Sequence, residues 1–232
     1  SDDSPRVYDN CPNNLSFTYE IGDAVKTQAA FDRADHIISE RFVINRVTAN
    51  TMEGRGFVAD FDPGTGTCIV QGGVQSAFGT RRILSQTIFE QPENDFRVIS
   101  SDIGGGFGMK ANFYSECVLV AWASKLLCRP VRWISDRSEA FISDCHGRDN
   151  ISDVELALDN DGNFLALRVA NIANLGAYPS TIPAGPATIH LPGMIGVYKT
   201  PNAHVTVRGV FTNTNPIAAY RGAGRPEASY VI

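Results

Sequence analysis

Four glycines lie within five positions of this chain, at Gly104, Gly105, Gly106 and Gly108. They follow the apolar stretch 96–99 and precede a long apolar segment. Glycine gives up side-chain packing and costs backbone entropy. A cluster of it between two regular elements therefore indicates a sharp turn or a close approach of the backbone to another group. Successive N–H groups in such a loop can bind an oxyanion or a phosphate, and a tight turn without a ligand is the alternative.

The residues on either side of this loop predict an α+β fold with mixed β-sheets and packed helices. Alternating apolar and polar residues predict strands, and apolar residues spaced three to four apart predict helices. The expected strands are 15–21, 36–47, 57–62, 67–71, 96–100, 129–134, 151–158, 164–173 and 205–211. The expected helices are 24–34, 77–88, 112–127 and 136–141, and a further helix begins at 225.

The domain organisation is predicted to be simple. Residues 1–14 are expected to form an extended N-terminal tail or linker, and 15–232 one region without a long linker. Apolar residues cover most of the circumference of helix 112–127, which predicts burial on nearly all sides. Segment 176–201 is rich in Pro and Gly and is predicted to be irregular. Because the last helix is only beginning when the sequence ends, we expect a truncated piece of a longer chain.

Composition narrows the possible partners and compartments. The net charge is −5 without a broad basic excess, which argues against nucleic acid as a partner. No apolar run reaches the roughly 18–20 residues of a membrane span, and the polar, acidic start is not a secretory signal. The five cysteines form no CxxC pair, and the four histidines show no metal-ligand spacing. We therefore expect reduced thiols, no thiolate metal site and a cytoplasmic protein.

Three segments carry glycine or polar residues where a packed element would have apolar ones. In 71–76, the amide of Gln75 could hold an oxo group or the edge of a heterocycle, or could simply face solvent. The glycine loop lacks the P-loop pattern and the third glycine of a dinucleotide fingerprint, although N–H groups at a helix N-terminus can receive phosphate. In 219–227, Arg221 could fix an anionic or polarised ligand through its fork of donors, or form a structural ion pair.

The segments 102–110 and 219–228, in this order, resemble the molybdenum hydroxylases. This family includes xanthine dehydrogenase, aldehyde oxidase and aerobic carbon monoxide dehydrogenase, and the likeness is to the large, molybdopterin-binding subunit. The likeness extends over nearly the whole chain, through Gly22-Asp23, Met52-Glu53, Gln75, the segments 130–133 and 136–137, and Gly176-Ala177-Tyr178. The resemblance implies that 15–232 form the first part of the molybdopterin-binding region.

The resemblance also implies roles for particular residues. Gln75 matches the glutamine that approaches the oxo group of the molybdenum, and Phe107 matches the phenylalanine whose backbone N–H faces the same ligand. Both lie near the metal's ligands and are not themselves metal ligands. Arg221 matches the arginine that lines the substrate pocket and can polarise the substrate. The implied cofactor-binding residues are Gln75, Gly105, Gly106, Phe107, Gly108 and Gly222.

Two departures from the family pattern narrow the range of expected substrates. Copper-containing carbon monoxide dehydrogenases carry a cysteine directly after the arginine; here that position is Gly222, so no thiolate can hold copper. Xanthine-type enzymes carry a glutamate after the lysine of the glycine loop; here it is Ala111, which argues against a purine. An aldehyde or an N-heterocycle remains, hydroxylated with oxygen derived from water. The glutamate that serves the family as general base lies beyond Ile232, and neither Glu53 nor Glu116 is assigned that role.

The resemblance further implies a molybdenum–molybdopterin cofactor, in the cytosine dinucleotide form, and iron–sulfur and FAD partner subunits or domains. The chain alone is expected to be inactive and without the cofactor. It is also expected to expose an apolar face that the rest of the subunit covers, which favours self-association. Two alternatives stay open: a nucleotide- or phosphate-binding module without redox chemistry, and a non-catalytic relative that serves in assembly.

Overall fold

The computed structural model describes residues 4–181, 185–189 and 191–232. It divides into two compact units, of which the first comprises Ser1–Val47 with Cys145–Ile232 and the second Thr48–Asp144. The second unit is thus inserted into the sequence of the first. That 15–232 form the first part of a molybdopterin-binding region stays a prediction, and the structure adds that these residues are shared between two units.

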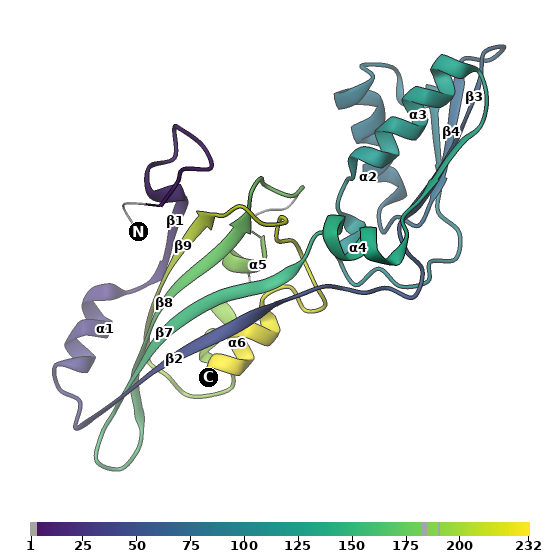
Figure 1. Cartoon of the computed structure of the whole chain (residues 1–232). Helices are drawn as coiled ribbons and strands as arrows, with labels where there is room; N and C mark the ends of the chain where they lie inside the picture. Colours follow the sequence, from purple (N-terminus) through teal and green to yellow (C-terminus); the bar gives the residue numbers. More distant parts are fainter. Residues whose placement is uncertain (1–3, 182–184, 190) are drawn as a thin grey trace. The chain divides into compact units, whose positions relative to one another are not determined.

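The first unit contains a five-stranded sheet in the order β1-β9-β8-β7-β2 (Figure 1). Its strands are β1 (Leu15–Gly22), β2 (His36–Val47), β7 (Gly147–Leu158), β8 (Phe164–Gly176) and β9 (Asn202–Phe211). Strands β8 and β9 are parallel, and the other neighbours are antiparallel. The hairpin predicted between 158 and 164 is confirmed.

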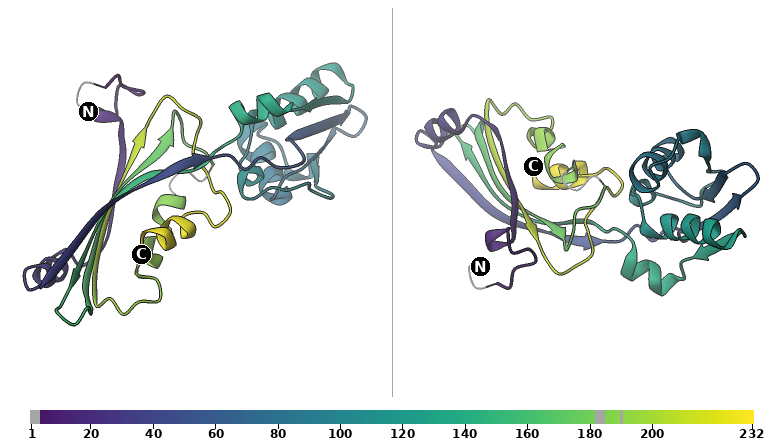
Figure 2. Two further views of the ribbon diagram at one scale, coloured as in Figure 1. Left: turned by 60° about the horizontal axis from the view of Figure 1, so that its bottom comes forward. Right: turned by 90° about the horizontal axis from the view of Figure 1, so that it is seen from above.

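Two helices cover the two faces of this sheet, because successive strand residues point to opposite sides. Leu167 and Val169 pack with Val231 of α6 (Arg225–Val231). Ala166 lies on the other face and packs with Phe31 of α1 (Ala24–Phe31). Figure 2 shows α6 against one side of the curved sheet.

The helix boundaries in this unit follow local chemistry. The carboxylate of Asp23 accepts a hydrogen bond from the N–H of Lys26 at 2.9 Å and starts α1 as predicted. Helix α1 ends at Phe31 and not at residue 34. The segment 176–201 holds two short helical turns, α5 (Gly185–Thr188) and η5 (Leu191–Ile195), with residues 182–184 and 190 outside the described part.

Residues 4–14 are folded, whereas the sequence predicted an extended tail. They form a turn, η1 (Pro12–Asn14), and return to the first unit. The ring of Tyr8 meets the ring of Phe211 edge-on at 4.9 Å between centroids. The Tyr8 hydroxyl donates to the carbonyl of Ala177 at 2.8 Å. An aromatic contact and a hydrogen bond therefore fix a segment whose sequence is mostly polar.

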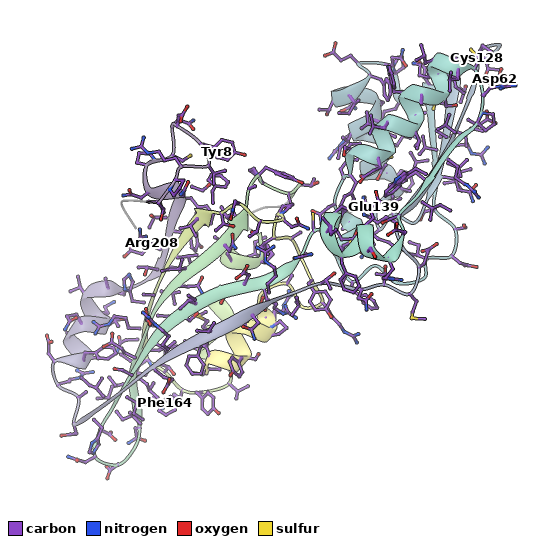
Figure 3. The ribbon with its side chains drawn as sticks, viewed as in Figure 1. Tyr8, Asp62, Cys128, Glu139, Phe164 and Arg208 are labelled. Carbon is purple, nitrogen blue, oxygen red and sulfur yellow. The ribbon has the colours of Figure 1, made fainter. Side chains whose placement is uncertain are left out.

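The second unit contains a four-stranded sheet in the order β5-β4-β3-β6. Its strands are β3 (Gly56–Asp62), β4 (Thr67–Gly72), β5 (Phe96–Ile99) and β6 (Val131–Ile134), with β4 and β5 parallel. Its helices are α2 (Ala77–Arg82), η2 (Ile83–Ile88), η3 (Glu93–Asp95), η4 (Met109–Ala111), α3 (Ser115–Leu127) and α4 (Arg137–Ser143). The predicted β3–β4 hairpin is confirmed. Its turn is closed by Asp62, labelled in Figure 3, whose carboxylate accepts from the N–H of Gly64 at 2.8 Å.

Helix α3 is exposed on one side, so the prediction of nearly complete burial is wrong. Leu119, Trp122 and Leu126 are 57%, 54% and 66% exposed, and their spacing places them on one face. Val120 and Ala121 on the other face pack into the core with the sheet. The sequence is apolar all round, but within this unit only one side of the helix meets a sheet. An exposed apolar face was expected, and α3 carries one.

The buried cysteines are free thiols, as predicted. Burial raises the pKa of Cys68 to about 11 and that of Cys117 to about 12, which keeps both protonated at neutral pH. Among the described residues, no His, Cys, Asp and Glu side chains group to hold a metal ion. No helix in the same residues is long and apolar enough to cross a membrane.

A buried arginine ties the helices of the second unit to its sheet. The side chain of Arg55 is 1% exposed and pairs with Asp144, itself 3% exposed, and with Glu116 at 2.9 Å. Its guanidinium lies over the ring of Tyr114 at 3.8 Å from the centroid. Because a buried charge is stable only when paired, this cluster connects the strand start, α3 and the end of α4.

Replacing Arg55 with Met should lower the free energy of unfolding of the second unit by about 3–5 kcal/mol, because Asp144 and Glu116 would lose the guanidinium that offsets their charge. Urea denaturation followed by tryptophan fluorescence measures this unit alone, since both tryptophans, Trp122 and Trp133, lie in it. Arg82→Met is the matched control, because Arg82 is exposed and should change stability by less than about 0.5 kcal/mol. Equal midpoints for the two variants would contradict this account.

Candidate functional site

Gln75 lies in the turn between β4 and α2, at the point where Ser76 caps the helix. The backbone N–H of Gln75 donates to the carbonyl of Lys110 at 3.1 Å. Its side-chain Oε1 accepts from the N–H of Gly108 at 2.9 Å. The amide of Gln75 is thereby oriented, and its Nε2 has no hydrogen-bond partner in the part of the chain that the structure describes. The exposed Gln75 side chain is therefore an oriented donor.

The glycine loop takes conformations that side chains rarely adopt. Gly105, Phe107 and Gly108 have φ of 95°, 52° and 97°, in the left-handed region that favours glycine. A Cβ at Gly106 would lie 2.6 Å from Oε1 and 2.7 Å from Cδ of Gln75. Gly106 is thus required for the close approach of the Gln75 amide, and its own N–H makes no hydrogen bond within residues 4–181, 185–189 and 191–232.

An ion pair joins the glycine loop to the segment before β3. Lys110, with no exposed side-chain surface, donates from Nζ to Oε2 of Glu53 at 2.6 Å. The same oxygen accepts from the N–H of Gly104 at 2.9 Å. The N–H of Glu53 in turn donates to the carbonyl of Gly104 at 3.1 Å. Three hydrogen bonds to Glu53 therefore hold both the start of the loop, at Gly104, and its end, at Lys110.

The hydrogen bond from Lys110 holds the pKa of Glu53 below its ordinary value, and the N–H of Gly104 lowers it further against the opposing effect of desolvation. A carboxylate held in this way is a poor proton acceptor near neutral pH. Glu53 is therefore unsuited to act as a general base. Glu116 is likewise engaged, by Arg55.

A hollow of about 360 Å³ lies beside this ion pair in the second unit. Its walls include Glu53, Gly73, Asp102 and Arg132. A Cβ at Gly73 would lie 3.1 Å from Oε2 of Glu53 and 3.3 Å from Nζ of Lys110. The backbone of Gly73 therefore passes directly over the ion pair. Gly73 also lines the hollow and lies two residues before Gln75 in the sequence.

Arg221 and Gly222 lie in the first unit, in a turn before α6. Gly222, Ala223 and Gly224 have φ of 95°, 49° and 98°. A Cβ at Gly222 would lie 2.6 Å from Cδ of Pro226, so the turn closes tightly on the first residues of α6. Arg221 itself is exposed. The tight turn accounts for the glycines around Arg221.

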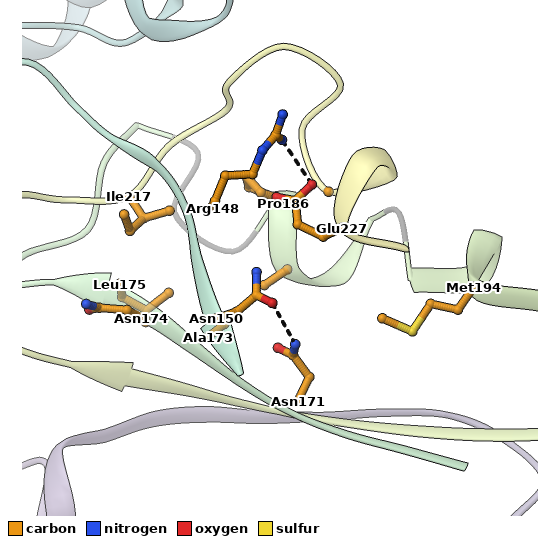
Figure 4. Close-up of a pocket in the computed structure, with 12 residues that line it drawn as sticks. Arg148, Asn150, Asn171, Ala173, Asn174, Leu175, Pro186, Met194, Ile217 and Glu227 are labelled. Atoms are coloured by element: carbon orange, nitrogen blue, oxygen red, sulfur yellow. Dashed lines mark hydrogen bonds and ion pairs between the residues drawn. The ribbon is translucent and has the colours of Figure 1, made fainter. Parts of the chain in front are cut away.

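Arg148 of β7 forms hydrogen bonds with this turn and with α6. Its guanidinium donates to the carbonyls of Tyr220 and Arg221 at 3.1 and 2.9 Å and to Glu227 at 2.9 Å. Figure 4 shows the Arg148–Glu227 pair at the wall of a cavity that also meets Asn150. The cavity has a volume of about 30 Å³, room for about two water molecules.

The structure thus brings the predicted residues together in two groups. Gln75 and the glycine loop, with Gly105, Gly106, Phe107 and Gly108, form one group in the second unit. Arg221 and Gly222 form the other in the first unit. Glu53, Lys110, Arg148 and Glu227, which connect these groups to the fold, were not predicted as site residues. Lys110 and Glu227 lie within the two glycine-containing segments, whereas nothing in the sequence near Glu53 or Arg148 marks them, since their partners are 57 and 73 residues away.

Known proteins match this chain over most of its length. A profile of the family described as "Molybdopterin cofactor-binding domain" matches residues 7–232. The carbon monoxide dehydrogenase large chain of Hydrogenophaga pseudoflava is 38% identical over 227 residues, which are 95% of this chain and 28% of the relative. The 6-hydroxypseudooxynicotine dehydrogenase complex subunit gamma of Paenarthrobacter nicotinovorans is 35% identical over 201 residues, 87% of this chain and 25% of the relative.

Solved structures agree with these matches. Quinoline 2-oxidoreductase from Pseudomonas putida 86 superposes with a TM-score of 0.84 at 33% identity, over 91% of this chain and 27% of that chain. The chain therefore spans about a quarter of the length of the relatives it matches.

The pH dependence of stability tests the Glu53–Lys110 pair. Folding lowers the pKa of Glu53 below its ordinary value of 4.5. The pair therefore stabilises the fold fully above pH 4.5, and its contribution is lost as the pH falls through the lower pKa of the folded state. The gap in unfolding free energy between the wild type and Glu53→Gln, measured by tryptophan fluorescence in urea, should be largest at pH 7 and shrink towards pH 3. Glu139→Gln, in the first turn of α4, is the control. A gap that does not change with pH would contradict the assignment.

Proposed function

Because this chain belongs to the molybdopterin cofactor-binding domain family, we propose that it is part of the catalytic subunit of a molybdenum hydroxylase. The complete protein would hydroxylate a carbon of an aldehyde or an N-heterocycle with oxygen derived from water. The observation that carries the proposal is the hydrogen bond from Gly108 to Oε1 of Gln75, which orients a free amide donor beside a glycine loop. Oxygen ligands of a metal are acceptors that suit such donors.

The residues present fit a metal that is held by an organic cofactor. Gln75 Nε2 and the N–H of Gly106 are neutral donors, which bind oxygen atoms and do not coordinate a metal ion themselves. The lack of a side chain at Gly106 allows a close approach. When bound, the molybdenum cofactor supplies the oxygen transfer and accepts the electrons. The protein's part is to place donors where charge develops on oxygen, in a site fixed before the reaction.

Each predicted site residue has a part in this proposal. Gln75 and the backbone N–H of Phe107 would lie beside the oxygen ligands of the molybdenum, and Gly105, Gly106 and Gly108 would let the cofactor approach. Arg221 would line the substrate pocket and polarise the substrate through its planar fork of donors. Gly222 carries no thiolate, so the proposal does not extend to a copper site or to oxidation of carbon monoxide.

The substrate and partners are further parts of the proposal. Relatives whose names refer to a hydroxypseudooxynicotine and to quinoline support a heteroaromatic substrate, and Ala111 in place of a glutamate argues against a purine. We propose that the cofactor has the cytosine dinucleotide form and that electrons leave through iron–sulfur and FAD partners. A cytoplasmic location is proposed from the composition. The second candidate is a nucleotide-binding or assembly module, which the glycine loop alone would also permit.

In the full-length protein, Gln75→Ala should reduce kcat about 100- to 1000-fold, the usual loss when one donor to a developing oxyanion is removed. Gly106→Ala should act in the same direction, because its Cβ displaces the Gln75 amide. Turnover of aldehydes and N-heterocycles is measured together with bound molybdenum. Gln86→Ala, whose Nε2 donates to Glu93, is the matched control in the same unit. Normal turnover in Gln75→Ala would favour the binding or assembly module.

The purified 232-residue chain should hold far less than one equivalent of molybdenum and should not hydroxylate any of these substrates. The reason is that the general base and further cofactor contacts are proposed to lie outside these residues. Elemental analysis after gel filtration measures the metal. Molybdenum near one equivalent on this chain would contradict the expectation.

A further inference from the structure

Two consecutive residues at the start of β7 adopt a conformation that side chains rarely adopt. Arg148 has a φ of 64° and Asp149 a φ of 66°, and neither is glycine. Such backbone is strained and persists only where surrounding contacts fix it. The contacts are present, because the carboxylate of Asp149 accepts from Arg46 at 2.7 Å and from Asn174 at 2.9 Å. The strain therefore indicates that the direction of the Arg148 side chain matters.

The guanidinium of Arg148 binds two consecutive backbone carbonyls, those of Tyr220 and Arg221, with separate nitrogens. It also pairs with Glu227 in the first turn of α6. The side chains of Arg148 and Glu227 are 13% and 8% exposed, so the pair is shielded from water. One planar group thus fixes both ends of the segment from Tyr220 to Glu227.

The backbone of β7 is fitted to the same segment. A Cβ at Gly147 would lie 2.4 Å from Cβ of Tyr220, and the Arg148 guanidinium lies 5.0 Å from the centroid of the Tyr220 ring. The N–H of Ala223 donates to the carbonyl of Tyr220 at 2.9 Å. This carbonyl therefore accepts two hydrogen bonds, one from the turn and one from the guanidinium of Arg148. These contacts hold the main chain of Arg221 in place.

We propose that Arg148 is a positioning residue for Arg221, acting through the two carbonyls and Glu227 to fix where the Arg221 side chain begins. The inference rests on the proposed function for the role of Arg221 in the substrate pocket. Lysine could keep the ion pair with Glu227, but its single ammonium lacks the planar fork that holds both carbonyls. Arg148→Lys therefore keeps the positive charge next to Glu227 but removes the two hydrogen bonds to the carbonyls of Tyr220 and Arg221.

The first test uses the 232-residue chain and does not depend on activity. Hydrogen exchange at the N–H of Ala223 should become about tenfold faster in Arg148→Lys, as expected for the loss of about one hydrogen bond from the turn. Thermal unfolding by circular dichroism should stay near that of the wild type, and Arg148→Met should raise the exchange further. Arg168→Lys is the matched control, because Arg168 also pairs with a carboxylate and lies over an aromatic ring in the same unit. Unchanged exchange at Ala223 in both Arg148 variants would overturn the proposal.

The second test uses the full-length holoenzyme. Arg148→Lys should lower kcat/KM about tenfold or more while bound molybdenum stays at the wild-type level, and Arg168→Lys should leave both unchanged. A faster exchange at Ala223 with an unchanged kcat/KM would overturn the positioning role if Arg221→Lys does reduce turnover. If Arg221→Lys also leaves turnover unchanged, the proposed function of Arg221 fails, and the exchange experiment alone decides what Arg148 holds.

Discussion

A buried ammonium group without a partner would cost several kcal/mol, and Lys110 has no exposed side-chain surface. The fold of the second unit must therefore bring a carboxylate to it, and Glu53 is that carboxylate. Once Glu53 is in place, its second acceptor bond fixes Gly104, and the carbonyl of Lys110 fixes the backbone of Gln75. The glycine loop, Gln75 and the segment before β3 are thus parts of one hydrogen-bonded unit. The proposed cofactor site depends on this single ion pair.

In the first unit, too, a cation fixes a glycine-containing turn, but there the cation contacts the turn itself. There the cation is Arg148, whose side chain is 13% exposed, and it binds backbone carbonyls as well as the carboxylate of Glu227. In both units a glycine-rich turn has little packing of its own, and a cation from elsewhere in the sequence fixes it. Such turns can present backbone and side-chain donors without the disorder that glycine would otherwise bring.

Local chemistry explains why so much of the fold could be predicted. The cap at Asp23 and the hairpins need only residues close in sequence, and they are confirmed. The partners Glu53 and Lys110 are 57 residues apart, and no local pattern marks them as a pair. Periodicity also could not distinguish an apolar helix that is buried all round from α3, which meets a sheet on one side only. Gln75 drew attention as a polar residue in the glycine-containing segment between a strand and a helix, and its role was predicted from the family resemblance.

The central claim is that the Lys110–Glu53 pair holds the Gln75 amide against the glycine loop, and amide exchange at Gly108 tests it most directly. The N–H of Gly108 is bonded only to Oε1 of Gln75 among the described residues. In Lys110→Met this N–H should exchange about tenfold faster or more, while amides in the β3–β4 hairpin keep their wild-type rates. Exchange at Gly108 that is as slow in Lys110→Met as in the wild type would contradict the account.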